Sequence, residues 1–441
     1  MFTKLRIQNY KSIHDLELEL GRVNVFIGEN GCGKSNILEA VAFASAAQEN
    51  RLRNDDLAAK GIRITRPDMM MNSFAGAKAK QKITIELDVQ FPEVDPDTTT
   101  TINTALFSKS PTDITGTWQA EGGSSTHGFI ENDDGDVILE MDDEQRSVFK
   151  SVRNAIAMFL KGTKSPEKWL NEKWQTAVKS MEQFSDNHEG WKKALLYNLT
   201  QEDKENLVKQ FNLAFLNDFQ IYELQTNPLR GFNKQSYEIP GRNGENLDLW
   251  LESFYEFEWE KLIQYSKFIS WLDEQGILID KTGELDRKRL KLRSDSKLYF
   301  RDKFMQKKNN IFSVENANEG ALHILFYLAL FISHKTPHFF AIDNIENGLN
   351  PRLCRHLIKN LTELASENDK QSLITTHNPA VLDGLNLHDD EQRLFVVRRN
   401  KKGHTVVKRV QLKPDVEIGG HRLKLSELWM RGQLGGLPQN F

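Results

Sequence analysis

The sequence predicts an α/β protein in which a mixed sheet with flanking helices is split by a β-rich and helical insertion. Three observations lead to this fold class. Apolar strands alternate with helices near both ends of the chain, and helical periodicity dominates the middle. In addition, the short apolar run Val23–Ile27 leads into a glycine-rich loop and then into a helical segment. A buried strand followed by such a loop is typical of a phosphate-binding α/β domain.

The first half of this domain is expected to span residues 1–91. Residues 2–8 and 15–20 alternate apolar and polar side chains, which predicts two strands. The run Val23–Ile27 predicts a buried central strand, and Ile83–Phe91 alternates again. The helix after the glycine-rich loop should place one group of apolar residues on one side, namely Ile37, Leu38, Val41 and Ala42.

The middle of the chain predicts two inserted segments. Residues 92–142 are rich in Pro, Thr, Gly, Ser and Asp, which favours a loopy β subdomain with short strands at Gly116–Gln119 and Val137–Glu140. Residues 143–309 predict a helical insertion that ends in a basic segment. Its strongest helical pattern is Leu247–Leu272, whose aromatic stripe is typical of packing against a core.

The second half of the domain, with a C-terminal tail, is expected to span residues 310–441. The pattern predicts an alternation of helices and strands. These elements are the helix Gly320–Ser333, the strand His338–Ile342, a helix over 351–366, and strands at Ser372–Thr376 and Leu394–Arg398.

Composition indicates a globular protein and excludes several classes. The chain has 441 residues, of which 39% are hydrophobic and 27% charged, and its net charge of −4 does not by itself indicate a nucleic-acid partner. The two cysteines, Cys32 and Cys354, argue against a disulfide framework and for a reducing cytoplasm. No apolar run is long enough to predict a signal peptide or a membrane span. We therefore expect a cytoplasmic protein without a membrane partner.

The glycine-rich loop matches the phosphate-binding pattern GxxxxGK[ST]. Its glycines let backbone N–H groups converge on phosphates, and the helix that follows adds positive potential. We expect Lys34 to reach the β- and γ-phosphates of ATP and Ser35 to ligate Mg²⁺. Cys32 fits as a small filler residue, with a redox-sensitive thiol as the alternative. The expected nucleotide contacts are Gly28, Glu29, Asn30, Gly31, Cys32, Gly33, Lys34, Ser35 and Asn36.

A second acidic motif ends the predicted strand at Asp343. A buried strand that carries a carboxylate to its C-terminal edge is the Walker B pattern, and Asp343 is expected at the Mg²⁺ ion. The next residue, where a catalytic glutamate is usual, is Asn344, and an amide holds a water molecule without accepting its proton. The sequence thus favours slow hydrolysis. Glu346 is the alternative base, provided that the turn Asn344–Gly348 is unusual.

Three further motifs resemble those of ABC-type ATPases of the RecF/SMC kind. The turn Asn318, Glu319 and Gly320 before an apolar helix resembles their signature motif, which implies contact with the γ-phosphate of ATP held by a second subunit. Residues 347–351 resemble the D-loop, and His377 resembles the switch histidine near the γ-phosphate. The resemblance implies an ABC-type P-loop nucleotide-binding domain and an ATP-sandwich homodimer.

The N-terminal 45 residues resemble the same family. Arg6 and Lys11 are expected either near the nucleotide or as plain surface charges. The glutamine of the Q-loop is not placed, and Gln81 and Gln90 are candidates by position alone.

The chain also resembles the compact ATPases of prokaryotic phage-defence operons, of the PtuA (Septu), AriA (PARIS) and AbiLi/RloA types. This resemblance implies an ATPase subunit that forms clamped dimers or higher oligomers. It also implies control of a separate nuclease-like effector encoded nearby, in response to a phage-derived trigger. The alternative is a RecF/SMC-like ATPase that acts on DNA in repair or recombination.

A basic segment precedes the signature-like turn. Residues 287–308 hold ten Lys or Arg residues against Asp295 and Asp302, with Tyr299 and Phe300 among them. Such a segment suits nucleic-acid binding, and a solvated surface is the alternative.

Overall fold

The computed structural model describes most of the chain outside one long central stretch. The described residues are 1–74, 82–91, 95–113, 117–127, 216–232, 239–288, 290–411, 417–418, 421–422 and 424–435. The predicted strand Val137–Glu140 and the predicted helical residues 143–215 lie outside them, as does Gln81.

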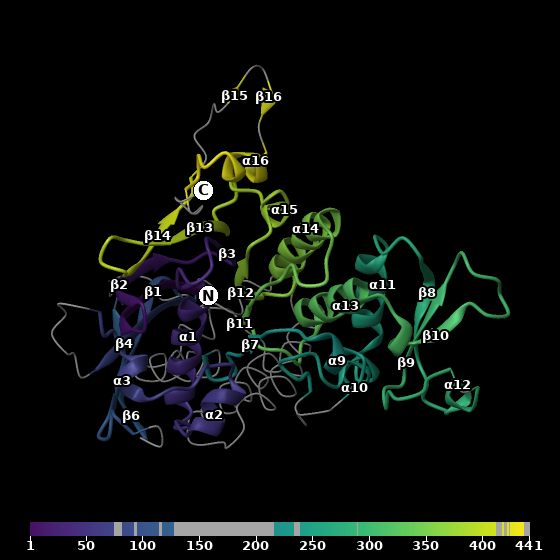
Figure 1. Ribbon diagram of the computed structural model, residues 1–441, viewed down its shortest axis with the longest axis horizontal. Coiled ribbons are helices and arrows are strands. Elements are labelled where there is room, and N and C mark those ends of the chain that lie inside the picture. The colour runs from purple at the N-terminus through teal and green to yellow at the C-terminus, as the bar shows by residue number, and fades with distance from the viewer. Residues whose placement is uncertain are drawn as a thin grey trace, which may run out of the picture.

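The first sheet is entirely antiparallel and occupies the left side of Figure 1. The alternation that predicted its first strands is seen as alternating burial, because Leu5 and Ile7 are fully buried while their neighbours are not. The Thr-rich residues expected in a loopy subdomain extend this same sheet by two strands. In spatial order the strands are β2 (Ile13–Glu19), β1 (Phe2–Tyr10), β4 (Ile83–Phe91), β5 (Asp95–Ser108) and β6 (Trp118–His127).

The second sheet is the centre of the molecule and is mostly parallel. Its strand β3, the predicted central strand Val23–Ile27, lies between two strands from the far end of the chain. Only the last pair is antiparallel. The order is β14 (Thr405–Arg409), β13 (Gln392–Arg399), β3, β12 (Gln371–Thr376), β11 (Phe339–Ile342) and β7 (Ile221–Tyr222).

Helices cover both faces of the central sheet. Side chains of β11 alternate between two cores: Phe340 and Ile342 pack with the C-terminal helices, while Phe339 and Ala341 pack with α1 and the first sheet. The helices of the N-terminal side are α1 (Lys34–Gln48), α2 (Asn54–Ala59) and α3 (Pro67–Met70). Those of the C-terminal side are α13 (Glu319–Ile332), α14 (Pro351–Glu367), α15 (Pro379–Leu382) and α16 (Leu425–Met430).

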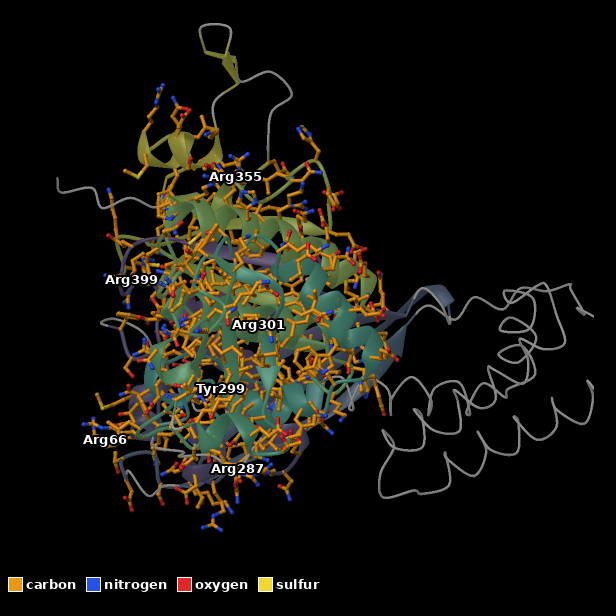
Figure 2. All side chains as sticks on the ribbon, turned by 90° about the vertical axis from the view of Figure 1, so that its right-hand side faces the viewer. Arg66, Arg287, Tyr299, Arg301, Arg355 and Arg399 are labelled. Carbon is orange, nitrogen blue, oxygen red and sulfur yellow. The ribbon has the colours of Figure 1, made fainter. Side chains whose placement is uncertain are left out.

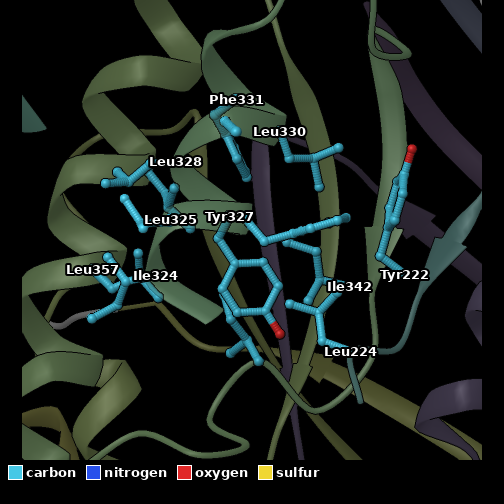
Figure 3. Close-up of a cluster of buried hydrophobic side chains, with 14 of the residues drawn as sticks. Tyr222, Leu224, Ile324, Leu325, Tyr327, Leu328, Leu330, Phe331, Ile342 and Leu357 are labelled. Atoms are coloured by element: carbon cyan, nitrogen blue, oxygen red, sulfur yellow. The ribbon is translucent and has the colours of Figure 1, made fainter. Parts of the chain in front are cut away.

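Helix α13 forms the centre of the larger core. All its residues after Glu319 are buried, and Figure 3 shows Tyr327 beside Ile342 of the central sheet and Ile324 beside Leu357 of α14. A helix that is apolar on every side must be enclosed by other elements. Replacing a buried leucine in such a core by alanine typically costs about 2–5 kcal/mol, so the position of α13 is firmly set by packing.

The remaining elements form a smaller lobe beside α13, on the right of Figure 1. Its sheet has the order β10 (Ile311–Ser313), β9 (Leu298–Asp302) and β8 (Leu272–Ile279). The helices are α9 (Thr226–Leu229), α10 (Leu247–Glu252), α11 (Glu256–Ser266) and α12 (Glu284–Arg287), with the 3₁₀ turn η2 (Val314–Asn316) before α13. A short pair, β15 (Glu417–Ile418) and β16 (His421–Arg422), lies near the C-terminus.

The prediction of one helix over 247–272 was wrong. Helix α10 ends at Glu252, and α11 begins after Tyr255. The break is stabilised by Glu258, whose fully buried carboxylate accepts the backbone N–H of Tyr255 at 2.8 Å. The same carboxylate accepts hydrogen bonds from the backbone N–H and the Nδ1 of His334. Capping at the N-terminus of α11 therefore overrides the helical periodicity of the sequence.

Candidate nucleotide-binding site

The glycine-rich loop lies where prediction placed it, between β3 and α1. Gly28 and Gly33 have positive φ angles of 154° and 108°. A Cβ atom on Gly28 would lie 2.1 Å from the carbonyl oxygen of Val397, and one on Gly33 would lie 2.2 Å from Oγ1 of Thr405. Both positions require glycine, because strands β13 and β14 approach the loop too closely for any side chain.

Lys34 lies inside this loop. Its side chain is almost completely buried, and Nζ donates to the carbonyl oxygens of Gly28 at 2.9 Å and Glu29 at 3.1 Å. Burial lowers the pKa of Lys34, and nearby acids, including Asp343 and Glu346, partly oppose that shift. An ammonium group enclosed by a loop of this shape fits the binding of a polyphosphate chain.

Ser35 and Asp343 meet at the carboxyl edge of the central sheet. Oγ of Ser35 donates to the Asp343 carboxylate at 2.9 Å, and Oγ1 of Thr375 donates to the same carboxylate. Thr375 also accepts the backbone N–H of Asn344 at 2.9 Å, which fixes the end of β11 against β12. Hydroxyl and carboxylate oxygens are the donors that Mg²⁺ prefers, so this pair fits the expected metal site.

The turn after Asp343 is unusual. Asn344 has a φ of 55° and Gly348 a φ of 70°, so two residues of this turn are left-handed. Asparagine tolerates that conformation better than most residues. The turn brings Glu346 beside the phosphate-binding loop: Oε1 accepts the backbone N–H of His377 at 2.7 Å, and Oε2 is buried without a hydrogen-bond partner.

His377 contacts the loop lysine. Its Nδ1 lies 3.4 Å from Nζ of Lys34. An ammonium group can only donate, so Nδ1 accepts and the proton of the neutral ring is on Nε2. Partial burial and the positive charge of Lys34 both lower the pKa of His377. The neutral ring therefore presents an N–H donor beside the loop at physiological pH.

We expect the titration midpoint of His377 to lie below the usual value of about 6.5. Replacing Lys34 by methionine should raise it, because removal of a neighbouring cation favours the protonated ring. The lowered pKa also affects stability. Between the pKa of His377 in the folded chain and its higher pKa in the unfolded chain, the unfolded state binds more protons. The free energy of unfolding therefore rises with pH across that window. NMR of the ring protons measures the midpoint, and an unchanged midpoint in Lys34→Met would contradict the contact.

Of the two N-terminal basic candidates, only Lys11 lies near the loop. Arg6 pairs with Asp15 at 3.4 Å on the half-exposed surface of the first sheet. Lys11 instead binds the buried carboxylate of Glu39 on α1, which also accepts from Tyr10 at 3.0 Å.

Arg63 joins the same carboxylate and was not predicted. Its Nε donates to Glu39, and its Nη2 donates to Oδ1 of Asn36 at 3.2 Å. Two cations on one carboxylate leave a net positive charge beside Asn36, which directly follows Ser35. Nothing in the local sequence of Arg63 indicates this role, because α1 brings Glu39 to it.

The signature-like turn begins α13, as expected. Asn318 accepts the backbone N–H of Ala321 at 3.3 Å and so caps the helix. A Cβ atom on Gly320 would lie 2.7 Å from the carbonyl oxygen of Gly348, so the helix start packs directly on the D-loop-like turn. Glu319 accepts from Oγ1 of Thr226.

Gln225, directly before Thr226, is a further candidate for the Q-loop glutamine. It follows the two-residue strand β7, which pairs in parallel with β11, so it emerges at the same carboxyl edge as Asp343. Gln225 is exposed, whereas Gln90 lies within β4 and donates to Thr99 of β5 at 3.1 Å. A strand of two residues is too short for periodicity to reveal.

The cysteine of the loop is inaccessible. Cys32 is buried, with its Sγ 4.0 Å from Nζ of Lys34, and burial raises the pKa of its thiol. A buried thiol with a raised pKa is poorly reactive, which favours the filler role over a redox role. Among the described residues, no helix combines the length and apolar character needed to cross a membrane.

Curated proteins that resemble this chain do so over a short stretch. The RecF replication and repair protein of Listeria welshimeri is 46% identical over 50 residues, which is 11% of this chain and 14% of that protein. RecF of Clostridium botulinum is 40% identical over 52 residues, again 14% of its length. The chain thus matches only about a seventh of these relatives.

Solved structures with a similar arrangement are SMC heads. The SMC head domain of Thermotoga maritima is 12% identical with a TM-score of 0.45, covering 93% of this chain and 99% of that one. A Pyrococcus furiosus Smc head with an extended coiled coil, bound to the C-terminal domain of ScpA, is 14% identical with a TM-score of 0.44, covering 93% and 96%.

A family profile matches most of the chain. It spans residues 23–383, from the central strand β3 through the phosphate-binding loop and Asp343 to the helix after His377. The matched region holds the phosphate-binding loop and the Asp343 strand on the mostly parallel central sheet, with helices on both its faces, as in a P-loop ATPase domain. The chain belongs to the family described as "AAA domain, putative AbiEii toxin, Type IV TA system".

Proposed function

We propose that two copies of this chain clamp ATP between them, and that the clamp controls a separate toxic effector in an anti-phage defence complex. One observation carries the clamp. Lys34, Ser35, Asp343, Glu346 and His377 form one connected group. Among the described residues, the hydrogen bonds of the Asn318 turn stay within α13 and reach Thr226, without joining that group.

The start of α13 packs on the turn that carries Glu346 but makes no hydrogen bond to the loop site among the described residues, so it suits the nucleotide of a partner copy. The first N–H groups of α13 have no partner within the helix, and the N-terminus of the helix carries positive potential. The polyphosphate held by Lys34 of one copy would then be completed by Asn318 and Gly320 of the other. ATP would then bridge the two copies.

The defence role rests on the family. Its description places the AAA domain in a Type IV toxin–antitoxin system, and a system of two components supports a chain that works with a partner protein. We propose a nuclease-like effector encoded nearby, held by the ATP-bound dimer or a higher oligomer and released on a phage-derived trigger. Co-purification with the neighbouring gene product, lost in Lys34→Ala, tests this part. An effector that binds Lys34→Ala equally well would contradict ATP control.

The clamp predicts complementation between two inactive variants. Lys34→Ala removes the phosphate ligand, while Asn318→Asp keeps a good helix cap but places a carboxylate against the phosphate. Each variant alone should lose ATP-dependent dimerisation. An equal mixture should recover about a quarter of wild-type turnover, because half the dimers are mixed and each contains one intact composite site.

Asn318→Ser is the matched control, since serine also caps helices but carries no charge. It should dimerise with ATP in analytical ultracentrifugation almost as the native chain does. Recovery of no activity in the mixture, with both variants folded, would show that each site is completed within one chain and would overturn the clamp.

Hydrolysis in this proposal is slow and depends on Glu346. Asn344 can hold the attacking water and the Glu346 carboxylate can accept its proton, with His377 and Gln225 as neutral hydrogen-bonding groups around the reacting phosphate. When bound, Mg²⁺ at Ser35 and Asp343 would neutralise phosphate charge.

A further inference from the structure

The basic segment before α13 forms an exposed surface. Arg287, Lys288 and Arg293 are exposed, as are Lys303, Lys307 and Lys308 at the hairpin that joins β9 to β10. Figure 2 faces this side of the molecule and shows Arg287 and Arg301 on it. Asp302 of the segment accepts the backbone N–H of Phe304 at 2.8 Å, and Asp286, directly before the segment, pairs with Lys291 at 3.2 Å.

The aromatic residues of the segment divide into two kinds. Tyr299 and Phe300 are fully buried, with Phe300 packed against Trp271 and Phe312, so neither can stack on a ligand. Phe304 at the hairpin tip is 75% exposed, and Nζ of Lys303 lies 5.3 Å from its ring centroid.

The hairpin that carries Phe304 is held in shape by its backbone. The N–H of Asp302 donates to the carbonyl oxygen of Asn310 at 2.8 Å, and that of Lys303 donates to Trp271 at 3.1 Å. The tip therefore offers a largely exposed ring beside lysines on an ordered turn.

We propose that this surface, Arg287–Lys308, binds single-stranded nucleic acid and that its occupancy is transmitted to the signature-like turn. The lysines and arginines would neutralise phosphates, and a base would stack on Phe304. An exposed ring favours a strand with unpaired bases over a duplex, whose bases are already stacked, and over an acidic protein, which needs no ring. The transmission step rests on the proposed ATP clamp; the binding step does not.

Glu315 connects the two regions. Its carboxylate accepts the backbone N–H groups of Leu292, Arg293 and Ser294 at 2.5–2.8 Å, so it fixes the basic segment to η2, directly before Asn318. Burial tends to raise the pKa of Glu315, but these three donors outweigh it and the pKa lies below its usual range.

A second connection runs through Arg230. Oγ of Ser294 donates to the carbonyl oxygen of Arg230 at 2.6 Å, and Nη2 of Arg230 donates to that of Ala317 at 3.1 Å. Arg230 ends the short segment that begins with Gln225. A shift of the backbone at Arg293 would therefore reach both Asn318 and the Gln225 segment.

The binding step is tested by fluorescence anisotropy with a labelled oligothymidylate of about 20 nucleotides, long enough to cover a typical single-strand site. The native chain should bind it with a strong salt dependence. Lys303→Glu/Lys307→Glu/Lys308→Glu should weaken binding about 100-fold or more, and Phe304→Ala about 10-fold. The matched control Arg355→Glu/Lys359→Glu/Lys401→Glu makes the same charge change at exposed positions elsewhere and should leave affinity within about 3-fold.

The transmission step is tested by the rate at which a fluorescent ATP analogue leaves the protein. The oligonucleotide should change this rate about 5-fold or more in the native chain. Glu315→Ala should keep oligonucleotide affinity but lose the change in rate. No oligonucleotide binding at low salt, or equal loss in the control triple variant, overturns the binding step. So does binding of an acidic peptide in its place. An unchanged rate overturns transmission alone, and ATP-dependent dimerisation measured in the same samples reports separately on the clamp.

Discussion

Replacing Glu346 by glutamine is expected to lower ATP turnover by about 100-fold or more, because the variant removes the carboxylate that accepts the backbone N–H of His377 and lies near Lys34. The amide keeps the size of the side chain. It can also still accept the backbone N–H of His377, so folding and ATP affinity should stay close to native. Turnover at saturating ATP, with the nucleotide affinity measured separately, checks this result.

The buried oxygen Oε2 gives a reason for this role. It has no hydrogen-bond partner, and an unpaired buried acceptor is costly unless something binds it. A water molecule oriented by Asn344 would satisfy it and would be positioned to lose a proton. A Glu346→Gln variant that hydrolyses ATP at the native rate would remove Glu346 from the chemistry.

Asn344→Glu provides the opposite change. A carboxylate at the usual position should raise turnover about 10-fold, since general-base catalysis typically contributes far more than that when geometry is ideal. Asn344 has a φ of 55°, and a glutamate there would cost about 1–2 kcal/mol in backbone strain. We therefore expect faster hydrolysis together with a lower free energy of unfolding. Faster turnover in Asn344→Glu/Glu346→Gln would show that the two acids act independently.

The parts of the site that lie within one local motif could be predicted. The loop Gly28–Ser35 and the acid Asp343 each follow a buried strand, and the carboxyl ends of neighbouring parallel strands meet at one edge. Both therefore come to the same edge of the central sheet, where Ser35 and Asp343 meet at 2.9 Å. The turn at Asn318 before an apolar helix was equally local.

The parts that depend on packing could not. Arg63 reaches the loop only because Glu39 on α1 is buried beneath it. Gln225 lies at the sheet edge only because a two-residue strand pairs with β11. From the sequence, Glu346 could be named as a base only on the condition that the turn Asn344–Gly348 is unusual, and the left-handed turn that brings Glu346 to His377 could not itself be predicted.

The same reason explains where the predicted elements differ. The aromatic stripe of 247–272 continues through the break at Ser253–Tyr255, and only the three-way contact of Glu258 reveals the second helix start. The Thr-rich run of β5 looks loop-like by composition, yet it pairs along its length with β4 and β6. Context determines β structure more strongly than residue type.

Asp343→Asn is expected to abolish the effect of Mg²⁺ on ATP binding. In the native chain Mg²⁺ should strengthen binding about 10-fold or more, because a carboxylate is a far better ligand than an amide for this ion. In the variant the ratio of dissociation constants with and without Mg²⁺ should fall to about 1, while affinity without Mg²⁺ should remain. Titration with a fluorescent ATP analogue, with and without a chelator, gives both values.

Thr375→Val separates ligation from positioning. Oγ1 of Thr375 donates to Asp343 and accepts the N–H of Asn344, so its loss should loosen the turn without removing a metal ligand. The variant should keep a clear Mg²⁺ effect but lose about 10-fold in turnover, since a displaced base is a weaker catalyst. If Asp343→Asn kept the full Mg²⁺ effect, the metal would have to lie elsewhere, and the pairing of Ser35 with Asp343 would be structural. The Asp343 carboxylate already accepts from the hydroxyl groups of Ser35 and Thr375. Metal binding would exchange one of these donors for Mg²⁺, and Asp343→Asn and Thr375→Val together isolate that step.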